Sequence, residues 1–266
     1  MIVKSVSYTK KHIDKYPFNT ELIKNFKALE FKTPITFIVG ENATGKSTFI
    51  ETLACSLELV TVGNESVKSD PAFKEVRQLA KHFRISKNSF MRTGFFLRSE
   101  DFISFTKNQR KVVAELKRDL EEMEKDFEGK SDYAKMLMRG PLVGSIYATE
   151  NYYNGYLDAK SHGESFLELF HSRLVPNGIY ILDEPEVALS PQNQYALMAM
   201  ILDSVKEGSQ FIIATHSPII EALPNSTIYE VKEGHFNEIE YEDLESVQFY
   251  RAFLENPKRY VTYLEE

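Results

Sequence analysis

A glycine-rich segment of this chain has the residue types and the spacing that bind phosphate. Residues 40–47 read GENATGKS, which has the form G-x-x-x-x-G-K-[ST]. In such a loop the backbone N–H groups and the N-terminus of the next helix attract a polyphosphate. Lys46 adds a full charge at the β- and γ-phosphates, and the Ser47 hydroxyl is placed to ligate Mg²⁺. The predicted phosphate-binding residues are Gly40, Asn42, Ala43, Thr44, Gly45, Lys46, Ser47 and Thr48.

Two carboxylates follow an apolar run further along the chain. Residues 179–182 read IYIL and predict a buried strand, and Asp183 and Glu184 come directly after it. An aspartate at this point can hold Mg²⁺, directly or through water. Glu184 is one residue further along, so its side chain points in a different direction from that of Asp183 and can reach a water molecule. A carboxylate beside a γ-phosphate is a plausible general base or water-positioning group. Without the glycine-rich loop, the segment would also fit an ordinary charged strand-to-helix loop.

His216 follows another apolar run, FIIA at 211–214, in the same way. If these strands are parallel, their carboxyl ends meet at one edge of the sheet, and His216 lies near Lys46 and Asp183. There it would donate to a γ-phosphate or hold the attacking water together with Glu184. A lone histidine is otherwise more commonly a satisfied loop or core residue.

Small residues precede the helix predicted at 165–174. The segment Ser161-His162-Gly163-Glu164-Ser165 would place a glycine and serines at a helix N-terminus, which is an anion site. Simple capping is the other interpretation, because Ser161 and Ser165 both suit an N-cap.

The elements that must position these residues follow from the patterning. An apolar run at 35–39 predicts a strand before the glycine-rich loop, and 48–59 predicts a helix after it. Strands that alternate with helices predict an α/β fold with a mixed, mostly parallel sheet flanked by helices. We assign 1–100 and 158–266 to two parts of one nucleotide-binding lobe, and 101–157 to an inserted helical lobe.

Inside this insertion the patterning changes. Residues 107–127 have the spacing of an amphipathic helix, although the run is too short for a sustained coiled coil. Residues 128–156 contain several glycines and tyrosines and are expected to be irregular.

The composition is that of an ordinary soluble globular protein. The 266 residues are 42% hydrophobic and 27% charged, and the net charge of −7 gives no global basic signature for nucleic acid. Cys55 is the only cysteine, which excludes an intramolecular disulfide and suits a reducing cytoplasm. No apolar run approaches a membrane span, and the N-terminus lacks the apolar core of a signal peptide. We therefore expect a cytoplasmic protein with no direct membrane insertion.

Together these segments resemble the ATP-binding-cassette (ABC) ATPases. The matching segments are the P-loop at 40–47, the signature (usually LSGGQ) at 161–164, the Walker B strand and catalytic glutamate at 179–184, the D-loop at 188–191 and the switch histidine at 216. Their order and spacing agree over about 30–55 and 160–220. The short motifs are most similar to those of the soluble SMC/AAA-like branch of predicted bacterial ATPases.

The resemblance implies a P-loop NTPase of the ABC type that binds ATP and Mg²⁺ and hydrolyses ATP. ATP on the P-loop of one subunit would be closed over by Ser161 and Gly163 of a second subunit, in a head-to-tail homodimer with two-fold symmetry. ATP would hold the dimer together and hydrolysis would open it. The implied catalytic residues are Lys46, Glu184 and His216, and the implied metal ligands are Ser47 and Asp183.

Several positions depart from the family pattern or stay open. The lever glutamine before the helical lobe is missing, and Ser99 or Glu100 is the candidate in its place. The D-loop offers Ser190 where the family has aspartate, and Glu164 replaces the second signature glycine. Three residues keep two interpretations each. Tyr16 and Phe18 would either stack on adenine or pack in the core. Arg98 would either face a phosphate or pair with a carboxylate.

The leading hypothesis is an ATPase whose ATP-driven dimerisation controls an unidentified effector protein or nucleic acid, for example in nucleic-acid processing or phage defence. The alternative is the nucleotide-binding subunit of an ABC transporter, which normally carries LSGGQ and the lever glutamine. A P-loop small-molecule kinase would need an arginine-rich lid and would not need Gly163 or His216. A clamp that uses ATP only structurally would hold nucleic acid through the basic residues between Lys81 and Arg98, which are otherwise typical of solvated surface.

Overall fold

A six-stranded sheet lies at the centre of the molecule. The computed structural model describes residues 1–9, 13–61, 67–68, 70–89, 93–127, 129, 131–151 and 162–262. The sheet has the order β5-β6-β7-β3-β8-β9, and all neighbours are parallel except β8 and β9. The predicted mostly parallel sheet is therefore confirmed. Its strands are β3 (Ile35–Val39), β5 (Thr93–Arg98), β6 (Gly178–Asp183), β7 (Gln210–Ala214), β8 (Ser226–Lys232) and β9 (His235–Ile239).

A smaller antiparallel sheet, of order β2-β1-β4, lies beside it. Its strands are β1 (Val3–Tyr8), β2 (Ala28–Glu30) and β4 (Phe83–Lys87). The buried side chain of Gln210, at the start of β7, connects the two sheets. Its Oε1 accepts from the N–H groups of Ile2 (2.9 Å) and Val3 (2.8 Å), and its Nε2 donates to the Val3 carbonyl (3.0 Å). These bonds satisfy a buried amide and fix the first strand against the central sheet.

The central sheet is covered on both faces, which explains why its strands read as continuous apolar runs. On one face, Ile38 of β3 and Ile181 of β6 share a core with Phe49 of α2 (Lys46–Ser56) and with the small sheet. On the other face, Phe37 and Leu182 share a second core with α6 (His162–Arg173) and α7 (Pro191–Lys206). Neighbouring residues enter opposite cores because side chains alternate along a strand.

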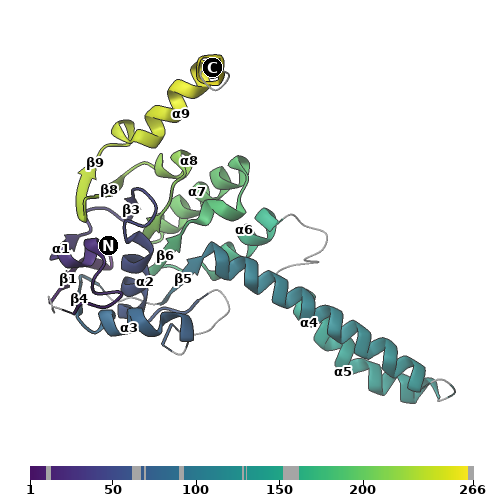
Figure 1. Cartoon of the computed structure of the whole chain (residues 1–266). Coiled ribbons are helices and arrows are strands. Elements are labelled where there is room, and N and C mark those ends of the chain that lie inside the picture. The colour runs from purple at the N-terminus through teal and green to yellow at the C-terminus, as the bar shows by residue number, and fades with distance from the viewer. Residues whose placement is uncertain are drawn as a thin grey trace.

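The remaining helices border this body (Figure 1). The short ones are α1 (Glu21–Asn25), α3 (Lys74–Ala80) and α8 (Pro218–Glu221), with 3₁₀ turns at Pro71–Phe73 (η1), Pro185–Ala188 (η2) and Tyr241–Asp243 (η3). Helices α9 (Glu245–Glu255) and α10 (Pro257–Thr262) form an arm that leads away from the body to the C-terminal end (Figure 1). In the part of the chain that the structure describes, no helix is both long and apolar enough to cross a membrane.

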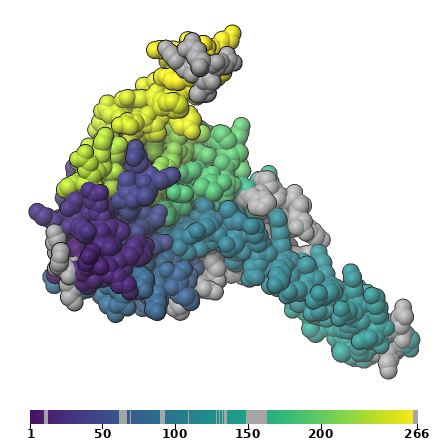
Figure 2. Space-filling view, in the orientation of Figure 1, coloured from purple at the N-terminus to yellow at the C-terminus, as the bar shows by residue number. Residues whose placement is uncertain are grey.

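Two long helices, α4 (Ser99–Asp126) and α5 (Asp132–Asn151), form a hairpin that projects from the body (Figures 1 and 2). The expectation that residues 128–156 are irregular is wrong for the part that forms α5. Each interior glycine costs a helix about 1 kcal/mol, but Leu142 and Ile146, four residues apart, are covered on one side of α5 and offset that cost. The assignment of 101–157 as a separate lobe stays a prediction.

Gly94 lies where β5 approaches β6 too closely for any side chain. A Cβ there would lie 2.0 Å from the carbonyl oxygen of Ile179 and 2.8 Å from its Cγ2. We expect Gly94→Ala to push the strands apart and lower the free energy of unfolding by about 1–3 kcal/mol. Gly144→Ala is the matched control and should not lower stability, because among the described residues no heavy atom outside the surrounding helix backbone lies within 4 Å of that Cβ position. Chemical denaturation measures both, and a Gly94→Ala protein as stable as the parent would contradict this packing.

Candidate functional site

The glycine-rich loop connects β3 to α2 as the sequence predicts. Gly40 has φ +136° and a Cβ on it would lie 2.6 Å from the Val231 carbonyl oxygen, so this position requires glycine. Gly45 has φ +95° and immediately precedes α2, which begins at Lys46. The first N–H groups of α2 therefore face the concave side of the loop, the arrangement that binds anions.

Lys46 lies folded over this loop. Its side chain is buried, and its Nζ donates to the carbonyl oxygens of Gly40 (2.6 Å) and Glu41 (2.7 Å). Burial lowers the pKa of Lys46, and the carboxylates of Glu184, Asp183 and Glu41 act in the opposite direction. The ammonium group is thus held at the loop by backbone acceptors, which a phosphate oxygen could replace.

Asp183 ends β6 and carries an unsatisfied buried oxygen. The residue is 8% exposed, and its Oδ1 has no hydrogen-bond partner among the described residues. Burial raises the pKa of Asp183 to about 7, and Glu184 and Glu51 add to the rise, while the Ser47 hydroxyl and Arg98 lower it. A buried carboxylate oxygen beside a hydroxyl is an oxygen donor set that fits Mg²⁺.

Glu184 and His216 face each other at the ends of neighbouring strands. Glu184 has left-handed backbone angles (φ 50°, ψ 51°), and its N–H donates to the Ala214 carbonyl at 2.9 Å. Its Oε1 lies 3.9 Å from Nε2 of His216, and both side chains are about two-fifths exposed. This separation is too long for a direct hydrogen bond, and a water molecule could bridge the two groups.

Glu186, to which no sequence motif assigns a role, holds the loop that carries His216. Glu186 Oε2 accepts from the Thr215 hydroxyl and Oε1 accepts from the His216 backbone N–H, both at 2.7 Å. One carboxylate on the turn after Asp183 thus fixes two consecutive residues at the end of β7. Only the fold reveals this contact, because 29 residues separate Glu186 from Thr215.

Gln194 of α7 adds a second connection from this loop to the predicted D-loop. Its Oε1 accepts from the Ser217 hydroxyl at 2.6 Å, and its Nε2 donates to the Leu189 carbonyl at 3.2 Å. Ser190 caps α7, since its hydroxyl accepts from the Asn193 N–H at 3.3 Å. The loop after β7 and residues 188–191 are therefore hydrogen-bonded to the same helix.

Arg98, for which the sequence left two interpretations, pairs with carboxylates. It contacts Glu51 of α2 (3.0 Å), Glu100 (3.1 Å) and Asp101 (2.7 Å). Of the two lever candidates, Ser99 is buried and its hydroxyl donates to the carbonyl oxygen of Glu184, whereas Glu100 is exposed and pairs with Arg98. The first residue of α4 therefore contacts the backbone of Glu184 directly.

Tyr16 and Phe18, the candidates for adenine contact, have different surroundings. Phe18 is buried and packs against the ring of His82, which fits the core interpretation. Tyr16 is 49% exposed, and its hydroxyl lies 3.5 Å from the Thr48 hydroxyl of the predicted phosphate site. Of the two candidates, Tyr16 is therefore the one that lies beside the predicted phosphate site.

The remaining predicted site residues lie on the P-loop and in the signature segment. Asn42 and Ala43 are exposed on the loop, and Thr44 donates from its hydroxyl to the Glu41 carbonyl at 2.8 Å. Ser161 lies outside the described residues. Gly163, in the first turn of α6, is buried, and a Cβ there would meet Asn193 Nδ2 at 2.3 Å and the Ala188 carbonyl oxygen at 3.3 Å. The nearest neighbours of Gly163 are therefore α7 and the D-loop, not the P-loop of its own chain.

Comparison with known proteins agrees with this fold. Residues 162–220, which include Asp183, Glu184 and His216, match the family described as the AAA ATPase domain. No curated protein matches the chain at a significant level.

Among solved structures, CbiO1 from Clostridium perfringens, described as part of the ABC transporter complex CbiONQ, aligns over 100% of both chains with 16% identity and a TM-score of 0.50. A nucleotide-free ATP-binding cassette from an ABC transporter aligns over 98% of this chain and 99% of its own, with 15% identity and a TM-score of 0.48. The Smc head domain with an extended coiled coil from Pyrococcus furiosus aligns over 97% and 100%, with 11% identity and a TM-score of 0.43.

The chain therefore has the fold of an ABC-type P-loop ATPase. ATPase domains of this kind bind nucleotide, and the match at 162–220 supports ATP hydrolysis, as the sequence predicts.

Glu186 fixes the His216 loop through two hydrogen bonds, and we expect the loop to lose order when a substitution removes them. Glu186→Ala should lower the free energy of unfolding by about 1.5–3 kcal/mol and reduce kcat for ATP hydrolysis by about 10- to 100-fold with little change in KM. Glu186→Gln keeps one acceptor oxygen and should fall between the parent and the alanine variant. Steady-state kinetics and thermal melts measure both effects, and a parental kcat in Glu186→Ala would contradict this role.

Glu221 lies in α8, after the His216 loop, and its burial should make the free energy of unfolding depend on pH. It is 2% exposed, and burial raises its pKa to about 7, with the charge of Glu186 adding to the rise. The native state thus holds this proton more tightly than the unfolded chain, and stability falls as the pH rises from about 4.3 towards about 7. Glu221→Gln cannot ionise, so its stability relative to the parent should rise by about 2–3 kcal/mol between pH 5 and pH 8.

Urea denaturation at the two pH values measures this difference. Glu255→Gln, at an exposed site on α9, is the control and should change stability equally at both. A Glu221→Gln effect that does not depend on pH would contradict the prediction.

Proposed function

We propose that this chain is an ATP-hydrolysing switch in which two copies close over two ATP molecules. One observation carries the proposal. Lys46, Asp183, Glu184 and His216 lie together at one edge of the sheet, whereas Gly163 packs against the D-loop of its own chain. The phosphate-binding and catalytic residues thus lie in one place, and the signature of the same chain lies elsewhere. A second copy that supplies its signature would complete the site.

In this proposal the P-loop binds the triphosphate. The β- and γ-phosphate oxygens replace the Gly40 and Glu41 carbonyls as acceptors of Lys46 Nζ, and the first N–H groups of α2 donate to the phosphates. Ser47 and Asp183 would hold Mg²⁺, which, when bound, neutralises phosphate charge. Tyr16 is our candidate for the base, because it lies beside Thr48.

Glu184 and His216 would then act on the attacking water. The water sits between Glu184 Oε1 and the γ-phosphorus, and Glu184 takes its proton as the new P–O bond forms. His216, held in place by Glu186, donates to a γ-phosphate oxygen. The bond from the γ-phosphorus to the β-phosphate oxygen breaks, and ADP and phosphate leave. Ser161 and Gly163 of the second copy would contact the γ-phosphate, so hydrolysis removes the contact that holds the dimer.

The hairpin is our candidate for passing this change to an effector. Its first residues contact the site through Ser99 and Arg98. We propose an effector protein or nucleic acid in the cytoplasm, as in nucleic-acid processing or phage defence. The second candidate is an ABC-transporter subunit, which the fold of CbiO1 favours. Purification from its source separates the two, because a transporter subunit would copurify with a membrane-spanning chain.

Loss of the general base should trap the ATP-bound dimer. Glu184→Gln should reduce kcat by about 10²- to 10⁴-fold. On gel filtration at about 1 µM it should elute as a dimer with ATP and Mg²⁺, but as a monomer without ATP. Lys46→Ala is the control, since it removes the phosphate contact and should bind no ATP. A Glu184→Gln protein that binds ATP and stays monomeric would show that the site is not shared between two copies.

A further inference from the structure

The outward face of α5 is apolar and exposed. We define this α5 face by seven residues: Tyr133, Met136, Leu137, Gly140, Val143, Gly144 and Tyr147. The five larger side chains are between 43% and 69% exposed. Exposed apolar residues of this size, gathered on one helix, are typical of an interaction surface rather than of scattered surface residues.

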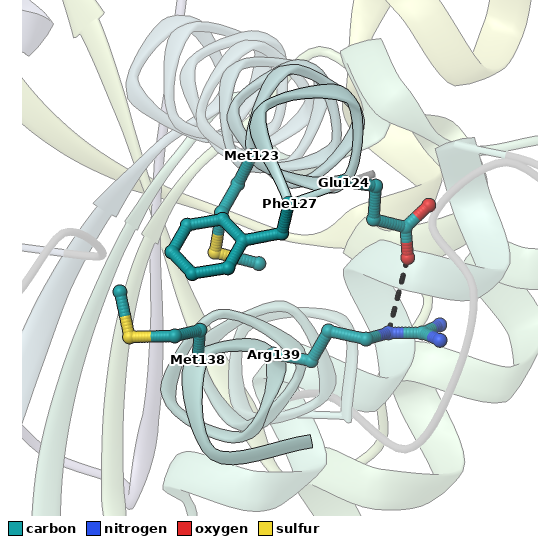
Figure 3. A pocket seen from close by; sticks show the side chains of 5 residues that line it. All are labelled: Met123, Glu124, Phe127, Met138 and Arg139. Atoms are coloured by element: carbon teal, nitrogen blue, oxygen red, sulfur yellow. Dashed lines mark ion pairs between the residues drawn. The ribbon is translucent and has the colours of Figure 1, made fainter. Parts of the chain in front are cut away.

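The opposite face of α5 is the one that packs on α4. Figure 3 shows the end of the hairpin, where Met123 of α4 and Phe127, the residue after α4, lie across from Met138 of α5 around a hollow of about 240 Å³. Arg139 and Glu124 close one side of this hollow with an ion pair of 3.0 Å. Nearer the body, Ile146 is 8% exposed. The interior of the hairpin is therefore packed by residues other than those of the α5 face.

Helical geometry places the glycines of the α5 face between its tyrosines. At about 100° per residue, positions seven apart fall on one line, so Gly140 lies midway between Tyr133 and Tyr147. Among the described residues, no heavy atom outside the surrounding backbone of α5 lies within 4 Å of a Cβ built on Gly140 or Gly144. These positions are depressions in the face, and a side chain of a second helix would fit into them.

The pattern of the α5 face is symmetric about Gly140. Turning the helix end for end about this residue exchanges Tyr133 with Tyr147, Leu137 with Val143 and Met136 with Gly144. The first two exchanges pair side chains of the same kind, and the third pairs a long side chain with a depression. We propose that the α5 face docks on the α5 face of a second copy of this chain, antiparallel, with Gly140 at the two-fold axis.

The charge and the size of the α5 face favour a second copy of this chain as its partner. Between residues 136 and 148 the only charged side chain is Arg139, and it is paired with Glu124, so the face offers little to nucleic acid or to an acidic peptide. The face from Tyr133 to Tyr147 is about 21 Å long and about 10–12 Å wide. Such a contact buries less than the roughly 1,200 Å² of a standard interface, so the pairing is weak and reversible. It needs no ATP and does not depend on the proposed catalytic dimer.

The first test measures self-association with the nucleotide site silenced. Lys46→Ala protein without nucleotide should show a reversible monomer–dimer equilibrium in sedimentation at tens of micromolar. Adding Leu137→Glu should weaken this association about tenfold or more, because two carboxylates enter an apolar contact. Adding Val143→Lys to that variant should restore most of the association, since the introduced carboxylate of each copy then faces the introduced ammonium group of the other.

The second test locates the axis. Gly140→Cys protein should be joined into dimers by a short bis-maleimide, whereas Ser145→Cys, exposed on the same helix but off the α5 face, should not. The native Cys55 is buried, which keeps the background low. ATP hydrolysis by Leu137→Glu in an otherwise native chain should equal that of the parent, so a failure of the catalytic proposal is told apart from a failure of this one.

Three results would overturn the inference. The first is a Lys46→Ala protein that stays monomeric up to about 100 µM, since a weak interface would be populated there. The second is association that Leu137→Glu leaves unchanged, which would place the contact elsewhere. The third is loss of association with no recovery in the Leu137→Glu, Val143→Lys protein, which would exclude the antiparallel register.

Discussion

The parallel pairing of β3, β7 and β6 is the interaction on which the site depends. Ile38 lies opposite Ala214, and Ala214 lies opposite Asp183, so the three chain segments that follow these strands leave the sheet at one edge. Both faces of the sheet are packed, and a shift of one residue in any strand would turn its side chains into the wrong core. The same burial that fixes the register therefore fixes the relative positions of P-loop, carboxylates and histidine.

Acidic side chains crowd this edge. Asp183 and Glu221 are both buried with an unsatisfied oxygen among the described residues, and neighbouring carboxylates raise the pKa of each further. Glu186 is the exception, because its two oxygens accept from the Thr215 hydroxyl and from the His216 N–H. The carboxylate of Asp183 is thus left for the Mg²⁺ that we propose, while the carboxylate of Glu186 holds the loop that carries His216.

The sequence was informative where the signal is local. The P-loop, its strand and helix, and the two later strands could be predicted because glycine geometry and apolar runs act over a few residues. Helix α5 was missed because Gly140, Pro141 and Gly144 argue against a helix locally, while the contacts that stabilise it come from α4. Glu186 and the pairing of Arg98 with Glu51 could not be predicted, because they join segments that only the topology brings together.

The contact between Ser99 and the Glu184 carbonyl gives the hairpin a mechanical consequence. Helix α4 has 28 residues, so it is about 42 Å long and begins at the atoms that would sense the γ-phosphate. A rotation of about 5° at its base moves the far end by about 4 Å, roughly the width of a side chain. In the switch that we propose, the hairpin would thus turn a small displacement at the site into a larger displacement at its far end, with a correspondingly smaller force.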